Sequence, residues 1–290
     1  MSWTMLLPAL VALGGAAAVG RFHRRLPPRT ATWLLTSLTI ACGLALLWAT
    51  ATVLSGYLAG QPVTENLFGW CSHLAHQREH VPTIAGLAAG ALLVVMVTGV
   101  VRSIRRYRRL CTEGGQPLEV LASAEPIAVT LPGRRPRVLI STGLLACLDH
   151  RQRQVVYAHE LAHARLRHHR FLLAGDIVVS AIPFLRPLAG PLSHAIERWA
   201  DEEAVSVVGD RRVVATAIAR AAIAVTAHAD GTLGMATGSV AERVRALLAP
   251  RPRYVVDRAW SSIGCLAVAL TVGASSIQLH HLFTFTQHLC

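Results

Sequence analysis

Four long apolar runs constrain the fold of this 290-residue chain more than any other feature of its sequence. A transmembrane helix needs about 20 apolar residues to cross roughly 30 Å of hydrocarbon, and each run has or approaches that length. We therefore predict an α-helical membrane protein with about four transmembrane helices. The predicted spans are residues 4–20, 33–57, 83–101 and 260–278.

The composition agrees with this prediction. Hydrophobic residues make up 53% of the chain and charged residues only 15%, whereas soluble domains are about 25% charged. A formal net charge of +12 would also suit a protein that binds nucleic acid. No DNA- or RNA-reading motif accompanies this charge, so we expect no direct nucleic-acid binding.

The distribution of arginine predicts the orientation in the membrane, because cytoplasmic loops beside spans are enriched in basic residues. Twelve arginines lie in segments 21–29, 102–109 and 251–258, whereas the loop at 58–82 contains only Arg78. These counts predict a multi-pass protein of the cell (inner or plasma) membrane. Both termini are expected to be external and residues 102–258 cytoplasmic.

The first part of the central region has strand patterns. Apolar residues alternate at 118–121 and at 127–129, and a turn is predicted at 132–133. A further short strand is predicted at 137–140, and helical periodicity begins near Leu144. The central region is therefore expected to be a mainly helical α+β domain.

A helix with two histidines follows. Asp149 and Gln152 have the spacing of a capping box, and no Gly or Pro occurs from there to Arg170, so we predict one continuous helix. His159 and His163 then lie one turn apart on the same face. This spacing lets two imidazoles bind one metal ion, with zinc–nitrogen distances of about 2.1 Å.

Acidic residues complete the candidate site. Glu160 would lie beside the metal, where it can take a proton from an activated water and pass it to the leaving amine. Zinc needs a third protein ligand, which Glu197 on a second helix can supply. Asp201, one turn further, can accept a hydrogen bond from a ligand imidazole. Alternatively, these two acids belong to a solvated helix face with Glu202 and Glu203.

The apolar segment 171–185 lies between the two motifs. A single crossing there would place His163 and Glu197 on opposite sides of the bilayer. Two crossings would need about forty residues, and only 33 separate the two ligands. We therefore predict a helix that does not span the membrane.

The motifs resemble a known family. The HELAH run at 159–163, followed by E-x-x-A-D at 197–201, is similar to the gluzincin pattern of the BlaR/MecR-type integral-membrane zinc metallopeptidases, which the HtpX and CAAX prenyl protease families share. Segments 132–136, 141–144 and 243–248 also resemble that family. The resemblance implies one Zn²⁺ ion bound by His159, His163 and Glu197, with Glu160 as the catalytic acid and base.

The predicted spans and motifs give a domain organisation that matches the layout of BlaR/MecR-type peptidases. It comprises three transmembrane helices with an external loop at 58–82 (residues 1–101), a cytoplasmic zinc metallopeptidase domain (102–258), and a fourth transmembrane helix with a short external tail (259–290). The antibiotic-sensing relatives carry a large extracellular penicillin-binding domain after the last span. Only residues 281–290 are expected to follow the last span here, so no such sensor domain is expected.

The implied function is a membrane-embedded zinc-dependent endopeptidase that acts on a protein or peptide substrate. A cytoplasmic regulator, such as a transcriptional repressor of the BlaI type, is the expected substrate in signal transduction. Two alternatives remain: an HtpX-like quality-control protease of membrane proteins, and a catalytically inactive transmembrane receptor. The intact HExxH pattern and acidic third ligand argue against the receptor.

Further residues lie near the motifs. His168 and His169 are expected to be surface or interfacial residues, because on a continuous helix they lie off the face of the two candidate ligands. Arg198 and Trp199 are expected to pack, and neither His228 nor Arg243 is assigned a catalytic role. The strand at 137–140 is the expected edge for an extended substrate to pair with.

Two external features stay open. His73, His76 and His80 would share a helix face, and the sequence does not decide between a metal-binding site and an ordinary polar loop. Cys71 and Cys290 would both lie outside the membrane, so they form either a disulfide or two unpaired thiols.

Overall fold

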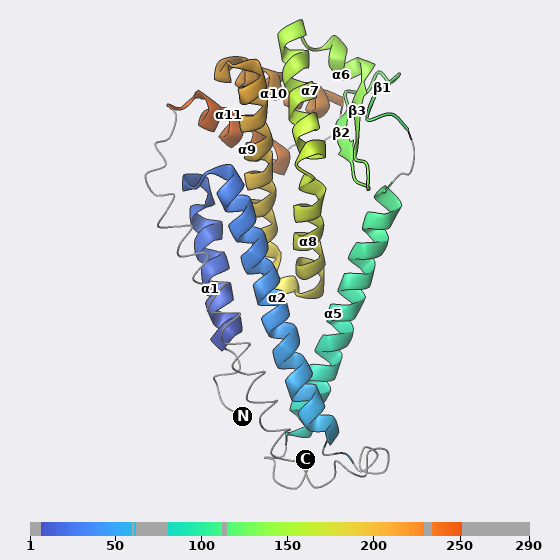
Figure 1. Cartoon of the computed structure of the whole chain (residues 1–290), viewed down its shortest axis with the longest axis vertical. Helices are drawn as coiled ribbons and strands as arrows, with labels where there is room; N and C mark the ends of the chain where they lie inside the picture. Colours follow the sequence, from blue (N-terminus) through green and yellow to red (C-terminus); the bar gives the residue numbers. More distant parts are fainter. Residues whose placement is uncertain (1–6, 60, 62–80, 112–114, 229–233, 251–290) are drawn as a thin grey trace.

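The computed structural model describes residues 7–59, 61, 81–111, 115–228 and 234–250. It is mainly helical, with one small sheet (Figure 1). In chain order its helices are α1 (Leu7–Phe22), η2 (His23–Arg25), α2 (Pro28–Ala59), α5 (Thr83–Leu110), α6 (Thr142–Ala146), α7 (His150–Arg165), α8 (His168–Ala181), η3 (Pro183–Leu188), α9 (Ala189–Val208), α10 (Arg211–His228) and α11 (Gly234–Leu248). The strands are β1 (Leu118–Leu121), β2 (Ala128–Leu131) and β3 (Arg137–Ser141).

Two of the described helices, α2 and α5, are long and apolar enough to cross a membrane. They meet at one end of the molecule and diverge toward the other (Figure 1). Only 22% of the most apolar window of α5 is buried within the molecule, so this helix is not enclosed in a core. These helices contain the predicted spans at 33–57 and 83–101, while α1 is 16 residues long and segment 260–278 lies outside the described residues.

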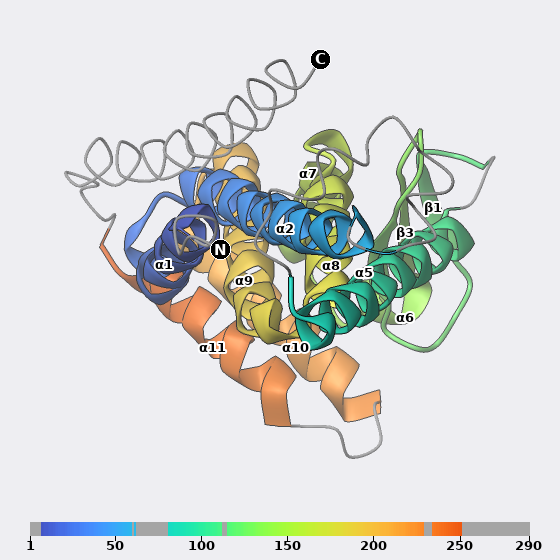
Figure 2. The ribbon, with the colours of Figure 1, turned by 90° about the horizontal axis from the view of Figure 1, so that it is seen from below.

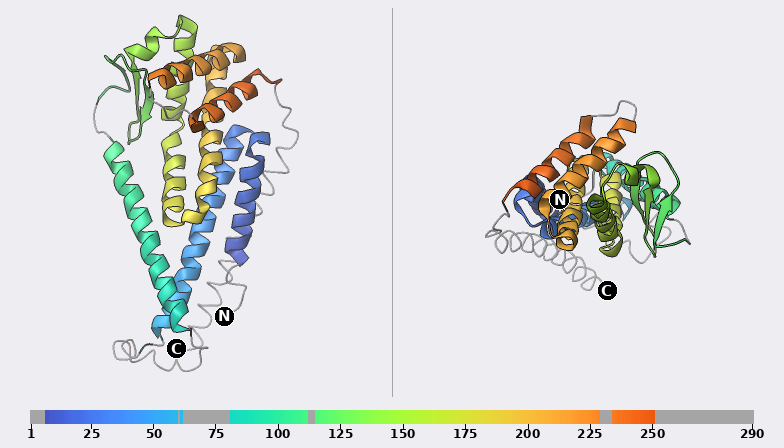
Figure 3. Two further views of the ribbon diagram at one scale, coloured as in Figure 1. Left: turned by 180° about the vertical axis from the view of Figure 1, so that it is seen from behind. Right: turned by 90° about the horizontal axis from the view of Figure 1, so that it is seen from above.

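A helical hairpin formed by α8, η3 and α9 packs beside α2 (Figures 1 and 3). Its buried residues share one core with α1 and α2, in which Leu35, Leu38, Ile182 and Ile196 are almost fully enclosed. Segment 171–185 therefore forms one arm of this hairpin and its turn. Because α9 runs back along α8, both ends of the hairpin lie at the same end of the molecule.

The small sheet has the strand order β1-β3-β2, with β1 parallel and β2 antiparallel to β3. All three predicted strands form, but the prediction that 137–140 is an edge was wrong. Strand β3 is central because it pairs with β1 on one side and with β2 on the other, and its Val138 and Ile140 are buried in the core against α6 and α7. Within the described residues, β2 pairs on one side only, and it lies next to α7.

Helix α7 begins at the predicted capping box. The Asp149 carboxylate accepts a hydrogen bond from the backbone N–H of Gln152 at 2.9 Å, and the side-chain oxygen of Gln152 accepts one from the backbone N–H of Asp149 at 3.2 Å. The predicted continuation to Arg170 was wrong. Arg167 adopts a left-handed conformation (φ 53°), and a new helix, α8, starts at His168. No Gly or Pro marks this break, and beyond it α8 packs against α2, α5 and α9.

Helices α10 and α11 pack side by side and cover the end of the molecule that contains α7. Figure 2 shows α9 between the α1–α2 pair and the α10–α11 pair. A second core joins α7, α9, α10 and α11 through Val155, Ala204, Val214 and Leu247. Helix α9 thus contacts both the apolar N-terminal helices and the helices that enclose the candidate site.

Candidate metal centre

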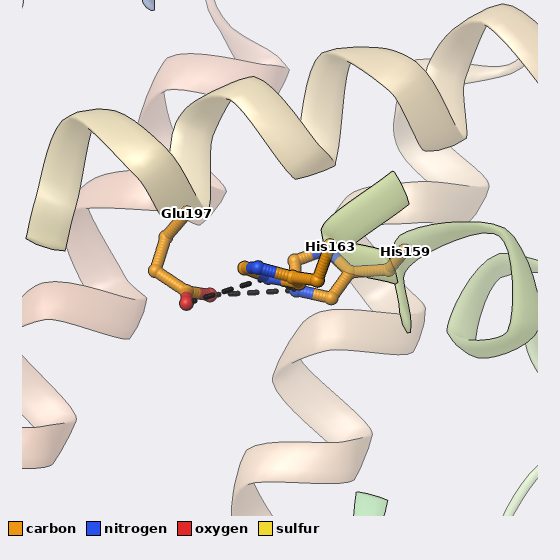
Figure 4. Close-up of side chains that lie close together, drawn as sticks. All are labelled: His159, His163 and Glu197. Atoms are coloured by element: carbon orange, nitrogen blue, oxygen red, sulfur yellow. Dashed lines mark hydrogen bonds and ion pairs between the residues drawn. The ribbon is translucent and has the colours of Figure 1, made fainter. Parts of the chain in front are cut away.

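Two imidazoles and one carboxylate converge between α7 and α9 (Figure 4). The Nε2 atoms of His159 and His163 are 3.2 Å apart. The Glu197 carboxylate places Oε2 at 3.4 Å from His159 Nε2 and Oε1 at 3.5 Å from His163 Nε2. The structure therefore brings together the three residues predicted as metal ligands, although α7 and α9 are separated by the whole α8 hairpin arm.

The spacing of these donor atoms fits a zinc ion. In a tetrahedral site with metal–ligand bonds of about 2.0–2.1 Å, neighbouring donor atoms are about 3.3 Å apart. The separation of the two imidazole nitrogens, 3.2 Å, matches this value, and each nitrogen has one of the two Glu197 carboxylate oxygens at a similar distance, 3.4 or 3.5 Å. Two imidazole nitrogens and a carboxylate also form a typical donor set of catalytic zinc sites, in which a fourth position stays open for substrate or water.

A buried ion pair supports the first histidine. Asp201 is 2% exposed, and its Oδ1 lies 3.1 Å from His159 Nδ1. Arg243 on α11 donates to both carboxylate oxygens of Asp201, at 2.8 and 2.6 Å. The same guanidinium lies 3.0 Å from Glu197 Oε2. Asp201 therefore lies inside the domain and does not belong to a solvated acidic face, and Arg243 links it to the third candidate ligand.

These contacts shift the pKa values of the site. Burial by itself lowers the pKa of His159, but the carboxylates of Asp201 and Glu197 outweigh it and raise that pKa to about 10. Burial opposes ionisation of Glu197, yet the neighbouring imidazoles and Arg243 hold its pKa below the usual range. The pKa of Asp201 is lowered by Arg243 and His159 against the same effect of burial. Both carboxylates are therefore anionic at neutral pH, as a cation site requires.

Glu160 lies next to the ligands and contacts the sheet. The hydroxyl of Thr130 on β2 donates to Glu160 Oε2 at 2.7 Å and lies 3.0 Å from the Glu160 carbonyl oxygen. Burial raises the pKa of the Glu160 carboxyl, and the charge of His159 and the Thr130 hydrogen bond partly offset this effect. A raised carboxyl pKa suits a group that must both accept and release a proton.

An apolar cavity opens beside Glu160. Its volume is about 550 Å³, and its polar end is formed by His159, Glu160, Glu197 and Arg243. The remainder is lined mainly by small or branched apolar side chains of α10 and α11, including Ile218, Ala222, Val225, Val240 and Val244. The cavity could therefore hold an apolar side chain close to the candidate metal ligands.

The expected surface position of His168 was wrong. Its side chain is fully buried, and its Nδ1 lies 3.0 Å from Nδ1 of His163. Burial and then the neighbouring His163 lower the pKa of His168 to about 3. On an uninterrupted helix these two residues would not face each other, but the break at Arg167 turns the His168 ring back toward His163.

The positions of His169, Trp199 and Arg198 agree better with the predicted interfacial and packing positions. His169 is half-buried and stacks on Tyr107 at a centroid distance of 6.3 Å. Trp199 is buried against His168. Arg198 is also buried, and its guanidinium donates to the carbonyl oxygen of Arg24 at 3.1 Å.

Sequence reasoning gave no role to Thr130, Arg243 or His168 in the site. Only Arg243 had a signal in the sequence, because it begins the 243–248 run that resembles the peptidase family. The side chain of His228, the histidines at 73, 76 and 80, and the cysteines at 71 and 290 lie outside the described residues.

Comparison with known proteins adds one finding. The sequence model of peptidase family M48 matches residues 116–187, which contain the sheet, α7 and α8 and end before Glu197. Comparisons with curated proteins and with solved structures gave no match. M48 peptidases are zinc-dependent, and the match contains nothing specific to BlaR/MecR-type peptidases. Over its strands and its two candidate histidine ligands, this chain is thus similar to the zinc metallopeptidases of family M48.

Proposed function

We propose that this protein is a membrane-embedded, zinc-dependent endopeptidase with a cytoplasmic catalytic domain. The observation that carries the proposal is the convergence of His159, His163 and Glu197 next to Glu160, whose carboxyl pKa is raised by burial. When bound there, zinc supplies Lewis-acid activation of a water molecule and of the scissile carbonyl.

The residues of the chain supply the proton transfers and the orientation. Glu160, held by the Thr130 hydroxyl, takes the proton of the attacking water and returns it to the leaving amine. Asp201, fixed by Arg243, orients the ring of His159. These roles need a rigid arrangement of α7, α9 and α11, which the shared core of these helices provides.

Two features support binding of an extended peptide. The unpaired side of β2 offers backbone groups next to Glu160, because Thr130 lies on this strand. The apolar cavity beside Glu160 accommodates a side chain of the same peptide. We expect a preference for an apolar residue adjacent to the scissile bond, since burial of apolar surface in the cavity favours binding.

The membrane location is supported by the long apolar helices α2 and α5. Large apolar side chains such as Trp33, Leu44, Ile84, Leu87 and Val94 are at least half exposed on these helices, where water would be a poor solvent for them. The arginine-rich segments of the sequence favour a cytoplasmic position for the catalytic domain.

The proposed substrate is a cytoplasmic regulatory protein, such as a repressor of the BlaI type, cleaved in response to a signal. This part rests on the resemblance in the sequence to BlaR/MecR-type peptidases. A regulatory enzyme would cut one preferred site, whereas a quality-control protease would cut many misfolded membrane proteins at many sites. Mapping the cleavage products of a set of candidate proteins separates these two functions.

The test of peptidase activity compares the purified full-length chain with its Glu160→Gln variant. We expect Gln to lower the cleavage rate by about 10²–10⁴-fold, while zinc binding, measured by titration, persists because the three ligands are unchanged. Removal of zinc by a chelator should abolish cleavage, and added zinc should restore it. Equal cleavage by both proteins, or cleavage that survives complete zinc removal, would contradict the proposal.

A further inference from the structure

His168 is a buried polar residue that the proposed reaction does not use. Its side chain is 0% exposed, and its Nδ1 lies 3.0 Å from His163 Nδ1. Its other ring nitrogen, Nε2, has no hydrogen-bond partner among the described residues. The ring instead packs on Trp199, with the centroids 4.9 Å apart and the planes inclined by 49°.

Such a residue is costly to bury. An imidazole that leaves water must regain its hydrogen bonds, and an apolar side chain of similar size would fill the same space without an unpaired nitrogen. The contact with His163 is the one polar interaction that offsets this cost within the described part of the chain. The position of His168 is therefore best explained by what it does to His163.

The two nitrogens of His163 have different surroundings. Nε2 faces His159 and Glu197, so a cation at the candidate site takes the lone pair of this atom. A neutral imidazole bound in this way carries its proton on Nδ1. That proton can be donated to His168 Nδ1, provided that His168 carries its own proton on Nε2.

We propose that His168 is a positioning residue, which accepts a hydrogen bond from His163 Nδ1 and so fixes the tautomer and orientation of this metal ligand. The inference rests on the proposed function, because it assigns His163 to a zinc ion. The two histidine ligands are then supported differently: His159 by the buried carboxylate of Asp201, and His163 by a neutral ring.

The surroundings of His168 hold its ring in place. It is the first residue of α8, directly after the left-handed Arg167. Helix α8 is fixed to α5 by the hydrogen bond between Ser103 and Ser180, at 2.9 Å. Trp199, which covers the ring, belongs to α9, the helix that carries Glu197.

The test uses the full-length chain with two nearly isosteric substitutions. In His168→Asn, the amide oxygen can occupy the place of the imidazole Nδ1 and accept the same hydrogen bond, whereas His168→Leu cannot accept one. The control is His169→Leu, which changes the neighbouring histidine that stacks on Tyr107. For each protein we would measure the affinities for Zn²⁺ and Co²⁺, the visible absorption of the Co²⁺-loaded form, and the melting temperature without metal.

We expect His168→Leu to weaken metal binding by about 10–100-fold and to change the Co²⁺ spectrum. His168→Asn and His169→Leu should bind metal more tightly than His168→Leu and keep the spectrum of the parent. A merely structural role predicts instead a lower melting temperature of the metal-free Leu variant with unchanged metal affinity, and that result would overturn the inference.

The outcomes also separate this inference from the proposed function. If the parent protein binds zinc and cleaves its substrate, but the Asn and Leu variants bind metal equally well, only the role of His168 fails. If His168→Leu does not fold, the comparison of His168→Asn with His169→Leu remains, and a loss of metal affinity in the Asn variant alone would count against the inference. If the parent protein binds no zinc at the site, the proposed function itself fails.

Discussion

Arg243 lies at the centre of the ionic contacts around the candidate site, although it belongs to α11, far along the chain from both motifs. It pairs with Asp201 through two hydrogen bonds and approaches Glu197 within 3.0 Å. Asp201 is almost fully enclosed, so its charge depends on this partner. Loss of one member of a buried ion pair is costly because the other charge stays buried and unpaired.

We therefore predict that Arg243→Met destabilises the protein by about 3–5 kcal/mol and weakens zinc binding. The double variant Arg243→Met with Asp201→Leu should be less destabilised than the sum of the two single variants, because it leaves no unpaired charge. Thermal unfolding of the metal-free proteins measures the first effect and zinc titration the second. Strictly additive losses would show that the pair does not act as a unit.

The candidate residues that could be predicted from the sequence are those on short local spacings. His159 and His163 are one helical turn apart, and Glu197 and Asp201 repeat the same spacing. Thr130 and Arg243 could not be assigned in this way, because their contacts depend on how β2 and α11 pack against α7 and α9. His168 was placed wrongly for a related reason: a single left-handed residue, Arg167, changes the helix face on which it lies.

At the scale of the elements, helices α5 and α8 approach each other closely at Gly99. A Cβ atom built on Gly99 would lie 2.2 Å from the carbonyl oxygen of Ser180, which no side chain can tolerate without movement of the backbone. Gly90, on the same helix, would place its Cβ 3.8 Å from Leu54, an ordinary contact. The two glycines therefore offer a matched pair of positions.

We predict that Gly99→Ala lowers the melting temperature by several degrees, because it forces α5 away from α8 and weakens the Ser103–Ser180 hydrogen bond. Gly90→Ala should leave the melting temperature unchanged or raise it slightly, since alanine favours the helix by about 1 kcal/mol. Both variants would be measured in the same detergent. An equal effect of the two substitutions would contradict the close approach at Gly99.

The elements themselves were predictable where a local pattern determines them. The three strands and the start of α7 followed from apolar alternation and from the capping box. The order of the strands did not, because it depends on pairing between segments apart in the chain: β3, the last of the three strands in sequence, pairs with both β1 and β2. The end of α7 was also missed, because no Gly, Pro or other local signal marks the left-handed residue Arg167.

At the scale of the whole molecule, the proposed membrane topology makes a prediction about the α8–α9 hairpin. The α8 arm is only 14 residues long, which is too short to cross the bilayer, so the hairpin is expected to return to the side on which it started without spanning the membrane. A reporter fused near residue 190 should therefore read as cytoplasmic, like one fused near residue 230. A reporter in the loop at 58–82 should read as external, and an external signal at residue 190 would contradict the proposed arrangement.

The core shared by α1, α2, α8 and α9 has a practical consequence. Leu35 and Leu38 of α2 are enclosed against Ile182 and Ile196, which flank the turn and the ligand-bearing part of the hairpin. A fragment that begins at residue 102 would lose the partner of this surface and leave a leucine- and isoleucine-rich face open to solvent. An excised peptidase fragment should therefore aggregate on expression, so biochemical work is better served by the chain with its N-terminal helices attached.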